Sequence, residues 1–268
     1  MMGAVQALLF DRQKGCVVFC LPGGGLVSDE INWLASVIRN SENIVFFGGA
    51  GVSTESGIPD FRSADGLYNM KYKYPPETIV SHSFFMQNTS EFYRFYREKM
   101  LHPDAKPNKA HYALAELEKR GKLKAIVTQN VDGLHHKAGS VNVLELHGSR
   151  ARYFCMDCGE KFTMDVVFES DDVPMCPCGG IIRPDVVLFE EALDQNVIEK
   201  SVRAISDAEV LIVGGTSLNV YPAAGLIQYY KGDMLILINK SETPFDKQAS
   251  LVIRDMIGET LDAACAAI

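Results

Sequence analysis

Four closely spaced cysteines are the clearest chemical signal in this chain. Cys155 and Cys158 form one pair, Cys176 and Cys178 form a second, and 17 residues separate the two pairs. Two such pairs can place four thiolates around one tetrahedral Zn²⁺, which leaves no coordination position open for water or substrate. The spacing therefore predicts one structural zinc ion per chain, and the alternative is four unrelated buried cysteines.

A histidine and several polar side chains form a second candidate site. Five predicted strands are each followed at once by a polar cluster, at residues 48–51, 128–132, 147–148, 214–217 and 239. Ligands of open α/β sheets bind at the carboxyl ends of the strands, so we expect these clusters to meet. His147 is the candidate general base because imidazole titrates near neutral pH, and Asn130 and Asp132 follow a neighbouring strand. Packing or capping roles are favoured for His135 and His136.

The first of these clusters continues into an unusual loop. Residues 48–63 read GGAGVSTESGIPDFRS and follow a short apolar segment. Glycines directly after a strand let the backbone approach a phosphate, but Thr54 stands where the dinucleotide-binding fingerprint has its third glycine. The acid, aromatic ring and cation of Asp60, Phe61 and Arg62 suit a charged, partly shielded reaction centre. For Asp60 an Asx-turn is the structural alternative.

The elements that must hold these groups alternate along the chain. Strands are predicted at 44–47, 123–127, 142–146, 186–189, 210–213, 234–238 and 251–253, and helices at 90–100, 108–119, 194–206, 222–230 and 258–267. This alternation predicts an α/β fold with a Rossmann-like, mostly parallel sheet covered by helices on both faces. A smaller inserted lobe then contains a helical module and the four-cysteine zinc ribbon.

The same pattern predicts how the chain divides. The Rossmann-like domain comprises residues 28–63, 108–150 and 184–268, and the small lobe comprises 64–107 and 151–183. Residues 1–27 differ in character and form an extension that we expect to be upstream sequence translated from an early start. The guanine-rich codons of three consecutive glycines would be the ribosome-binding site and Val27 a GTG initiator. A real N-terminal arm is the alternative.

Composition narrows the class of protein. The chain has 268 residues, a net charge of −8, 47% hydrophobic residues and 22% charged residues, as expected for a globular protein. The acidic balance argues against direct nucleic-acid binding, and no apolar run is long enough for a membrane span. One tight cluster among seven cysteines indicates metal binding in a reducing compartment, so we expect a cytoplasmic protein.

Taken together, these motifs resemble the sirtuins, the NAD-dependent protein-lysine deacylases, of a bacterial type. The resemblance runs from about residue 44 to residue 241 and includes GAGVSTESGIPDFR, TQNVDGLH, ELHG, the four cysteines and GTSLNVYPA. It implies that NAD lies extended between a Rossmann-like domain and a small zinc-containing lobe. The reaction would remove acetyl or another uncharged acyl group from protein lysines, giving nicotinamide and O-acyl-ADP-ribose.

The resemblance also implies roles for individual residues. The adenosine and phosphate portions of NAD would be held by Ala50, Thr54, Arg62, Thr216, Ser217 and Asn239. Gln129 would contact the nicotinamide ribose and Ile257 would cover the adenine. The nicotinamide pocket would be lined by Asn130, Val131 and Asp132. Phe61 would shield the positive charge that develops on the ribose, and His147 would take a proton from a ribose hydroxyl.

The acylated peptide would bind as an extended strand between Val187–Phe189 and Leu218–Val220. Here the chain departs from the family, because Glu190 replaces the glycine of a Phe-Gly-Glu motif. The extra acid suggests a preference for basic residues beside the acyl-lysine. A second departure concerns the Tyr-x-x-Arg pair of sirtuins that remove acidic acyl groups. Tyr93 matches the tyrosine, but the arginine of this chain lies one residue further on.

Other functions would use part of this pattern. A mono-ADP-ribosyltransferase would share the cleavage of NAD and differ in the group that captures the ribose. A non-catalytic NAD sensor would not need Asn130, Asp132 and His147. A zinc-ribbon nucleic-acid binder would explain the cysteines but not the other motifs. A Rossmann oxidoreductase would need a third glycine and a ribose-binding acid, and this chain has neither at the expected position.

Overall fold

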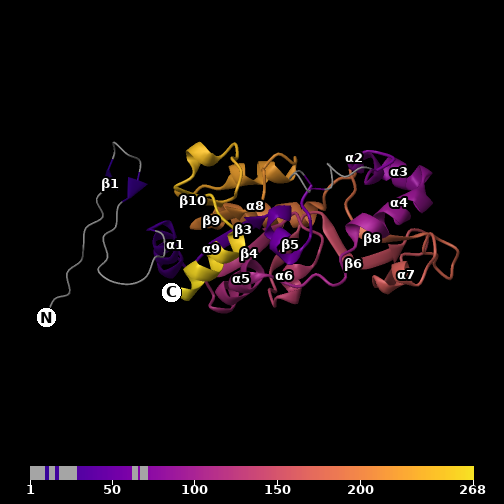
Figure 1. Cartoon of the computed structure of the whole chain (residues 1–268), viewed down its shortest axis with the longest axis horizontal. Coiled ribbons are helices and arrows are strands. Elements are labelled where there is room, and N and C mark those ends of the chain that lie inside the picture. The colour runs from indigo at the N-terminus through magenta and orange to yellow at the C-terminus, as the bar shows by residue number, and fades with distance from the viewer. Residues whose placement is uncertain (1–9, 12–15, 18–28, 62–65, 67–71) are drawn as a thin grey trace.

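The computed structural model describes residues 10–11, 16–17, 29–61, 66 and 72–268. Its centre is a parallel sheet of six strands in the order β11-β10-β9-β3-β4-β5 (Figure 1). The strands are β3 Ile44–Gly48, β4 Leu123–Thr128, β5 Val143–Glu145, β9 Val210–Gly214, β10 Met234–Ile238 and β11 Leu251–Ile253. The predicted Rossmann-like parallel sheet is confirmed.

Alternation along the central strands explains the two layers of helix. In β3, Phe46 belongs to the apolar cluster on one face of the sheet and Phe47 to the cluster on the other face. The first face is covered by α1 Asp29–Asn40, α5 Lys109–Lys119 and α9 Ile257–Ala266. The second is covered by α8 Gln195–Asp207 and the 3₁₀ helix η5 Ala223–Tyr229. Burial on both faces accounts for the nearly continuous apolar strand sequences.

A smaller lobe lies at the end of the molecule away from the C-terminus (Figure 1). It contains an antiparallel sheet of β6 Gly148–Cys155, β7 Lys161–Phe162 and β8 Ile182–Val186. Its helices are α2 Pro76–Ile79, α3 His82–Gln87, α4 Thr89–Phe95, the π-helix η4 Tyr96–Met100 and α7 Asp165–Phe168. Aromatic rings of α3, α4 and η4 pack with residues of β6 and β8 in a separate core. The lobe therefore has its own packing centre beside the sheet.

Short elements complete the chain. They are β1 Phe10–Asp11, β2 Cys16–Val17, α6 Leu134–Lys137 and the 3₁₀ turns η1 Ala50–Val52, η2 Thr54–Ser56 and η6 Asp246–Gln248. Strands β1 and β2 pair antiparallel within the first 27 residues. Most of that segment lies outside the described residues, as does Arg62. Among the described residues, no helix is both long and apolar enough to cross a membrane.

The predicted strand 186–189 is wrong. Val186 ends β8, which pairs antiparallel with β6 in the lobe, and Phe189 makes only an isolated bridge with Ser81. The strand begins before the predicted segment, since Arg183 and Asp185 are already paired with β6. A short apolar run gives no information about which sheet it joins, so periodicity alone could not place it.

Candidate active site and zinc site

A cavity of about 490 Å³ lies between the carboxyl edge of the parallel sheet and the lobe. That volume is within the range typical of ligand sites, roughly 300–1,000 Å³. Most of the residues predicted for the site line it, namely Ala50, Phe61, Gln129, Asn130, Val131, Asp132, His147, Thr216, Ser217 and Asn239. The five polar clusters that follow the strands therefore meet at one place.

Two of the predicted residues, Thr54 and Ile257, do not line this cavity, and a third lies outside the described residues. The Thr54 side chain is exposed and donates to the Gly51 carbonyl at 2.9 Å. Ile257 is buried in the core on one face of the sheet, where it packs against Gly214. Arg62 lies outside the described residues. Their roles toward a nucleotide remain predictions.

The glycines are required where two loops touch. Gly51 N–H donates to the Gly215 carbonyl at 2.8 Å, and a Cβ on Gly51 would lie 2.8 Å from the Gly215 Cα. Gly215 also has φ +60°, a conformation that glycine adopts without strain. Gln129 Nε2 donates to Thr216 Oγ1 at 3.0 Å, which joins the loop after β4 to the loops after β3 and β9. The sheet edge is thus assembled by close backbone approach.

His147 is held in one tautomer. It directly precedes Gly148, the first residue of β6, and its Nδ1 lies 2.9 Å from the Gln129 carbonyl oxygen. A carbonyl can only accept, so Nδ1 carries the hydrogen and Nε2 is left as the basic nitrogen. Burial lowers the pKa of His147 below its ordinary value, and the hydrogen bond to Gln129 opposes this shift. The imidazole is therefore neutral and able to accept a proton at pH 7.

Ser53 is a functional residue that the sequence reasoning missed. It is 1% exposed, donates to Asp132 Oδ2 at 2.7 Å, and accepts from Asn130 Nδ2 at 3.1 Å. Asp132 also accepts from the Leu134 backbone N–H at 2.8 Å. The hydroxyl thus fixes both the amide and the carboxylate of the candidate nicotinamide pocket. Its signal was a small polar residue two positions after the last glycine of the cluster.

Asn108 supports the same loop from outside the cavity. Its Oδ1 caps α5 by accepting from Ala110 N at 2.9 Å, while its Nδ2 donates to the Val52 carbonyl at 2.8 Å and to Ser56 Oγ at 3.0 Å. One side chain therefore joins the N-terminus of α5 to the turns that follow β3.

Beneath this loop, two histidines pack in the core. His135 is 2% exposed, and its ring centroid lies 4.7 Å from that of His111. Burial lowers the pKa of His135 to about 3 and that of His111 to about 4. Neither nitrogen of His135 has a hydrogen-bond partner among the described residues. His135 is thus a neutral packing residue, and the base that faces the cavity is His147.

Two segments line the side of the cavity where a peptide would enter. Val187 N–H is bonded to the His147 carbonyl and Phe189 N–H to the Val80 carbonyl, both at 3.0 Å. Among the described residues, the Val187 carbonyl and the Val220 N–H have no hydrogen-bond partner. These open groups belong to the two segments expected to pair with a peptide. Leu218 and Glu190, with φ of 56° and 76°, are the two non-glycine residues of positive φ in the described parts of the chain, and they lie in or beside these segments.

Glu190 and Glu191 have different surroundings. The Glu190 carboxylate accepts from Ser83 N at 2.9 Å and Ser83 Oγ at 2.6 Å, at the start of α3. Glu191 is paired with Arg183 at 2.7 Å and with His82 at 2.9 Å. Although burial raises the pKa of Glu191, bonds from Arg183, the Leu188 N–H and His82 outweigh it and lower that pKa to about 2. Both acids therefore attach the peptide-side segment to the lobe.

Tyr93 and Arg97 are used in the structure of the lobe. The Tyr93 hydroxyl donates to the Ile182 carbonyl. The Arg97 guanidinium donates to the carbonyls of Val167 and Ser170 at 3.0 Å and to that of Asp172. Neither residue lines the cavity. This agrees with the expectation that the pair does not bind an acidic acyl group.

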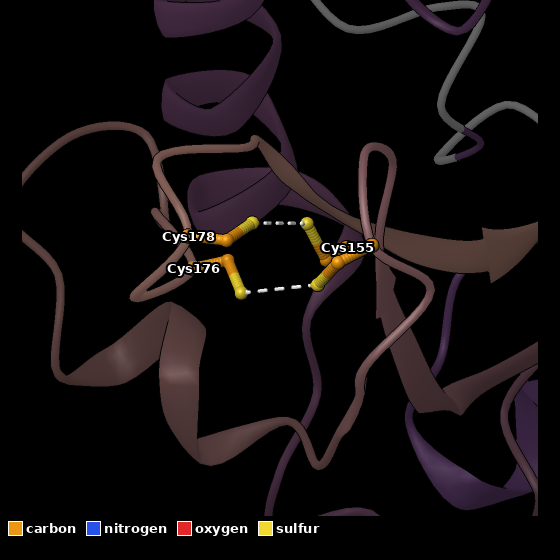
Figure 2. A group of neighbouring side chains, drawn as sticks. Cys155, Cys176 and Cys178 are labelled. Carbon is orange, nitrogen blue, oxygen red and sulfur yellow. Dashed lines mark hydrogen bonds between the residues drawn. The ribbon is translucent and has the colours of Figure 1, made fainter.

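The four cysteines converge as predicted. All four sulfur atoms lie within 4.8 Å of one another, with Cys155 3.5 Å from Cys178 and Cys158 3.6 Å from Cys176 (Figure 2). Zn–S bonds of about 2.3 Å in a tetrahedron require sulfur–sulfur separations of about 3.8 Å. A Cβ on Gly180 would lie 2.6 Å from Cys155 Sγ, so this glycine makes room for the sulfur. The donor set fits one structural Zn²⁺.

Comparison with known proteins gives a consistent result. A model of the Sir2 family matches residues 49–222. An NAD-dependent protein deacetylase of Clostridium acetobutylicum is 61% identical over 241 residues, which cover 88% of this chain and 98% of that protein. One of Cutibacterium acnes is 50% identical over 237 residues, covering 88% of this chain and 97% of that protein.

Solved structures also match. A Sir2 with p53 peptide and NAD⁺ has a TM-score of 0.77 at 41% identity, covering 86% of this chain and 95% of that one. A Sir2 bound to acetylated peptide also has a TM-score of 0.77, at 40% identity and with the same coverage.

Proposed function

This chain belongs to the Sir2 family, and we propose that it is an NAD-dependent protein-lysine deacetylase. It transfers acetyl, or another uncharged acyl group, from lysine to ADP-ribose and gives nicotinamide, free lysine and O-acyl-ADP-ribose. The observation that carries the proposal is His147, whose basic Nε2 shares one cavity with Asn130, Asp132 and the glycine loop. The names of the relatives and the NAD⁺ complex of a Sir2 support the same reading.

We assign the binding of NAD to the sheet edge. Ala50, Thr216, Ser217 and Asn239 hold the adenosine and phosphate portions, together with Arg62 and Thr54. Gln129 contacts the nicotinamide ribose, and Ile257 covers the adenine side from the core. Support comes from Gly51 and Gly215, whose backbones are in contact. Because glycine has no side chain, the backbone of these loops is open to an approaching phosphate.

Cleavage of the nicotinamide bond depends on three groups near it. Asn130 and Asp132 orient the nicotinamide, and their shared partner Ser53 supports this role by fixing both side chains. Phe61 keeps water from the anomeric carbon, where the acyl oxygen of the substrate attacks as nicotinamide leaves. His147 then accepts a ribose hydroxyl proton at Nε2, for which its neutral state is suited.

The acyl-lysine peptide binds as an extended strand between Val187–Phe189 and Leu218–Val220. The unpaired Val187 carbonyl and Val220 N–H support this arrangement, because strand addition needs open backbone groups on both sides. The Sir2 structure with acetylated peptide supports it by similarity. Membrane and nucleic-acid partners are not part of this proposal.

The test incubates the protein with NAD and one acetyl-lysine peptide and follows every product by mass spectrometry. Deacetylated peptide and O-acetyl-ADP-ribose are expected in equal amounts. His147→Ala should lower turnover roughly 10²- to 10⁴-fold, the usual contribution of a general base. His136→Ala, at a half-exposed histidine outside the cavity, is the matched control and should change turnover less than twofold.

Mono-ADP-ribosyltransfer is the second candidate, because it begins with the same cleavage of NAD at the same residues. A protein or peptide that gains the mass of ADP-ribose without losing acetyl would move it to first place. Absence of nicotinamide release with any acylated peptide would overturn both functions.

The sequence divides the chain into an NAD-binding domain of residues 28–63, 108–150 and 184–268 and a lobe of residues 64–107 and 151–183. We propose this division with one adjustment, because β6 begins at Gly148 and β8 ends at Val186 and both belong to the sheet of the lobe. Separate cores in the sheet and in the lobe support it. A cytoplasmic location is proposed on the four free thiols of the zinc cluster, which need a reducing compartment.

A further inference from the structure

A buried arginine lines the part of the cavity that faces the lobe. Arg150 is 8% exposed and belongs to β6, three residues after His147. Its backbone N–H donates to the Val131 carbonyl at 2.9 Å, which places it beside the candidate nicotinamide pocket. Together with Lys99 it gives this end of the cavity two cationic side chains, and His102, whose pKa is lowered by burial and by the charge of Arg150, lies beside them.

The backbone of β6 is shaped to direct this side chain. Gly148 and Ser149 pair in register with Val186 and Asp185, but the next pair in the ladder joins Tyr153 to Pro184. The intervening residues form an irregularity, a device that commonly re-aims side chains beside active sites. Arg150 lies in that irregularity and is buried, whereas its neighbour Ala151 is exposed.

The guanidinium is under-used by the protein. Its Nη1 donates to the Met100 carbonyl at the end of η4. Within the part of the chain that the structure describes, Arg150 makes no salt bridge and no other side-chain hydrogen bond. A buried arginine normally has a carboxylate partner, since removing its charge from water is costly. The acids nearby are otherwise held, Asp132 by Ser53 and Leu134, and Glu191 by Arg183.

The surroundings describe the missing partner. Phe92, Tyr96 and Met100 supply apolar walls to the same end of the cavity. The hydroxyl groups of Tyr96 and Tyr153 lie 3.0 Å apart. Burial raises the pKa of both hydroxyls, and the positive charge of Arg150 opposes this shift. A ligand that fits has a short methylene chain against the apolar walls and a terminal carboxylate, which guanidinium N–H groups bind as a fork.

We propose that Arg150 is a specificity-determining residue that extends the acyl range to dicarboxylic acyl groups such as succinyl. The inference rests on the proposed function. The amide carbonyl oxygen of the succinyl-lysine attacks the anomeric carbon of the NAD ribose as the bond to nicotinamide breaks. A ribose hydroxyl, which gives its proton to His147, then attacks the amide carbon. Addition of water breaks the bond from that carbon to the lysine nitrogen, so the products are nicotinamide, free lysine and O-succinyl-ADP-ribose. The charge comes from β6, and Tyr93 and Arg97 of the helical module take no part in it.

The test uses one peptide sequence carrying acetyl, malonyl, succinyl or glutaryl on the same lysine, with the full chain and NAD. Free-lysine peptide and each O-acyl-ADP-ribose are measured by mass spectrometry. The wild-type protein is expected to use succinyl with a kcat/KM within tenfold of that for acetyl. Arg150→Met should lower the succinyl-to-acetyl ratio of kcat/KM roughly 30- to 300-fold, with the loss appearing mainly in KM.

Two further variants separate charge from structure. Arg150→Lys keeps the charge without the fork and should give an intermediate ratio. Arg203→Met makes the same change as Arg150→Met at an exposed position on α8 and should leave the ratio unchanged. Circular dichroism and the NAD-induced shift in Tm report whether each variant folds and binds NAD.

The outcomes distinguish the two levels of inference. Acetyl turnover without succinyl, malonyl or glutaryl turnover in the wild type would overturn the role of Arg150 and leave the deacetylase standing. An equal fall for all acyl groups in both Arg150 variants would show that the residue only supports η4, which also overturns it. Failure of the wild type to release nicotinamide with every peptide would overturn the proposed function and this inference with it.

Discussion

The two walls of the cavity are built in different ways. The sheet wall is formed by loops that directly follow β3, β4 and β9, and it is joined by backbone contacts such as Gly51 to Gly215. The lobe wall is attached by side chains from distant segments, as in the bonds of Arg183 and His82 to Glu191. The first arrangement is fixed by local motifs and the second by tertiary packing, so the two walls should respond differently to perturbation.

Removal of zinc should give the largest difference between the responses of the two walls. Metal binding in small zinc modules contributes roughly 10–16 kcal/mol, far more than any single tether of the lobe. Chelation, or Cys176→Ser, is therefore expected to unfold the lobe and abolish deacylation while the sheet domain still binds NAD. Calorimetry should show the loss of one transition, and NAD binding should persist. Cys265→Ser, outside the cluster, is the matched control. Full activity without zinc would contradict the structural role.

Mild acid should lower the stability of the protein mainly through the two buried histidines on the sheet side of the cavity. The folded-state pKa values of His135, about 3, and His111, about 4, lie below the ordinary value of 6.5. As pH falls below 6.5, the unfolded chain binds protons that the folded chain does not. The free energy of unfolding should then fall with a slope that approaches about 1.4 kcal/mol per pH unit for each histidine, which amounts to a loss of roughly 3 kcal/mol for both between pH 6.5 and 5.

Urea unfolding between pH 7 and 5 measures this loss. His135→Leu should remove about half of the pH dependence, because a leucine has no proton to bind. His136→Leu, at the half-exposed neighbour, should leave the slope as it is. An identical slope in all three proteins would show that the buried pair does not govern acid stability.

Ser53→Ala should damage the sheet wall without disturbing the lobe. The variant leaves the Asp132 carboxylate and the Asn130 amide without their shared partner, at a cost of about 1–3 kcal/mol. We expect kcat to fall roughly 10- to 100-fold and the peptide KM to change little. Steady-state kinetics with varied NAD and varied peptide measure kcat and the peptide KM separately. Ser90→Ala breaks a serine–aspartate bond on the lobe surface and should have no effect on kcat.

Glu190 offers the smallest and most specific test of the lobe wall. Glu190→Gln keeps an oxygen for the Ser83 N–H but removes the charge. A preference for basic over acidic flanking residues, about two- to fivefold in kcat/KM, should disappear in this variant. Ser83→Ala should instead raise the peptide KM for both peptides alike, because it loosens the bond to α3. Equal use of acidic and basic peptides by the wild type would refute the charge effect.

The success of prediction did not follow this division between the walls, because a residue of the sheet wall was missed and the cysteine cluster of the lobe was found. His147, Asn130 and Asp132 were found because each follows a strand, and parallel strands bring their carboxyl ends to one edge. The cysteine cluster was found because its spacing is a chemical requirement of the metal. Ser53 was missed because its partner Asp132 is 79 residues away. The strand 186–189 was misplaced because its pairing partner β6 was not recognised.

The sequence by itself determined the parallel sheet, the edge at which its polar clusters meet and the zinc donor set, since these depend on periodicity, loop position and ligand spacing. Only the tertiary structure decided what each lobe side chain does. Arg97 and Arg150 are both arginines of the lobe, yet Arg97 donates to the carbonyls of Val167 and Ser170 whereas Arg150 lines the cavity. Arg150 lies at the irregular register of β6 and β8, and Arg97 reaches carbonyls about 70 residues further along the chain. Both arrangements join segments far apart in the chain and have no local signature.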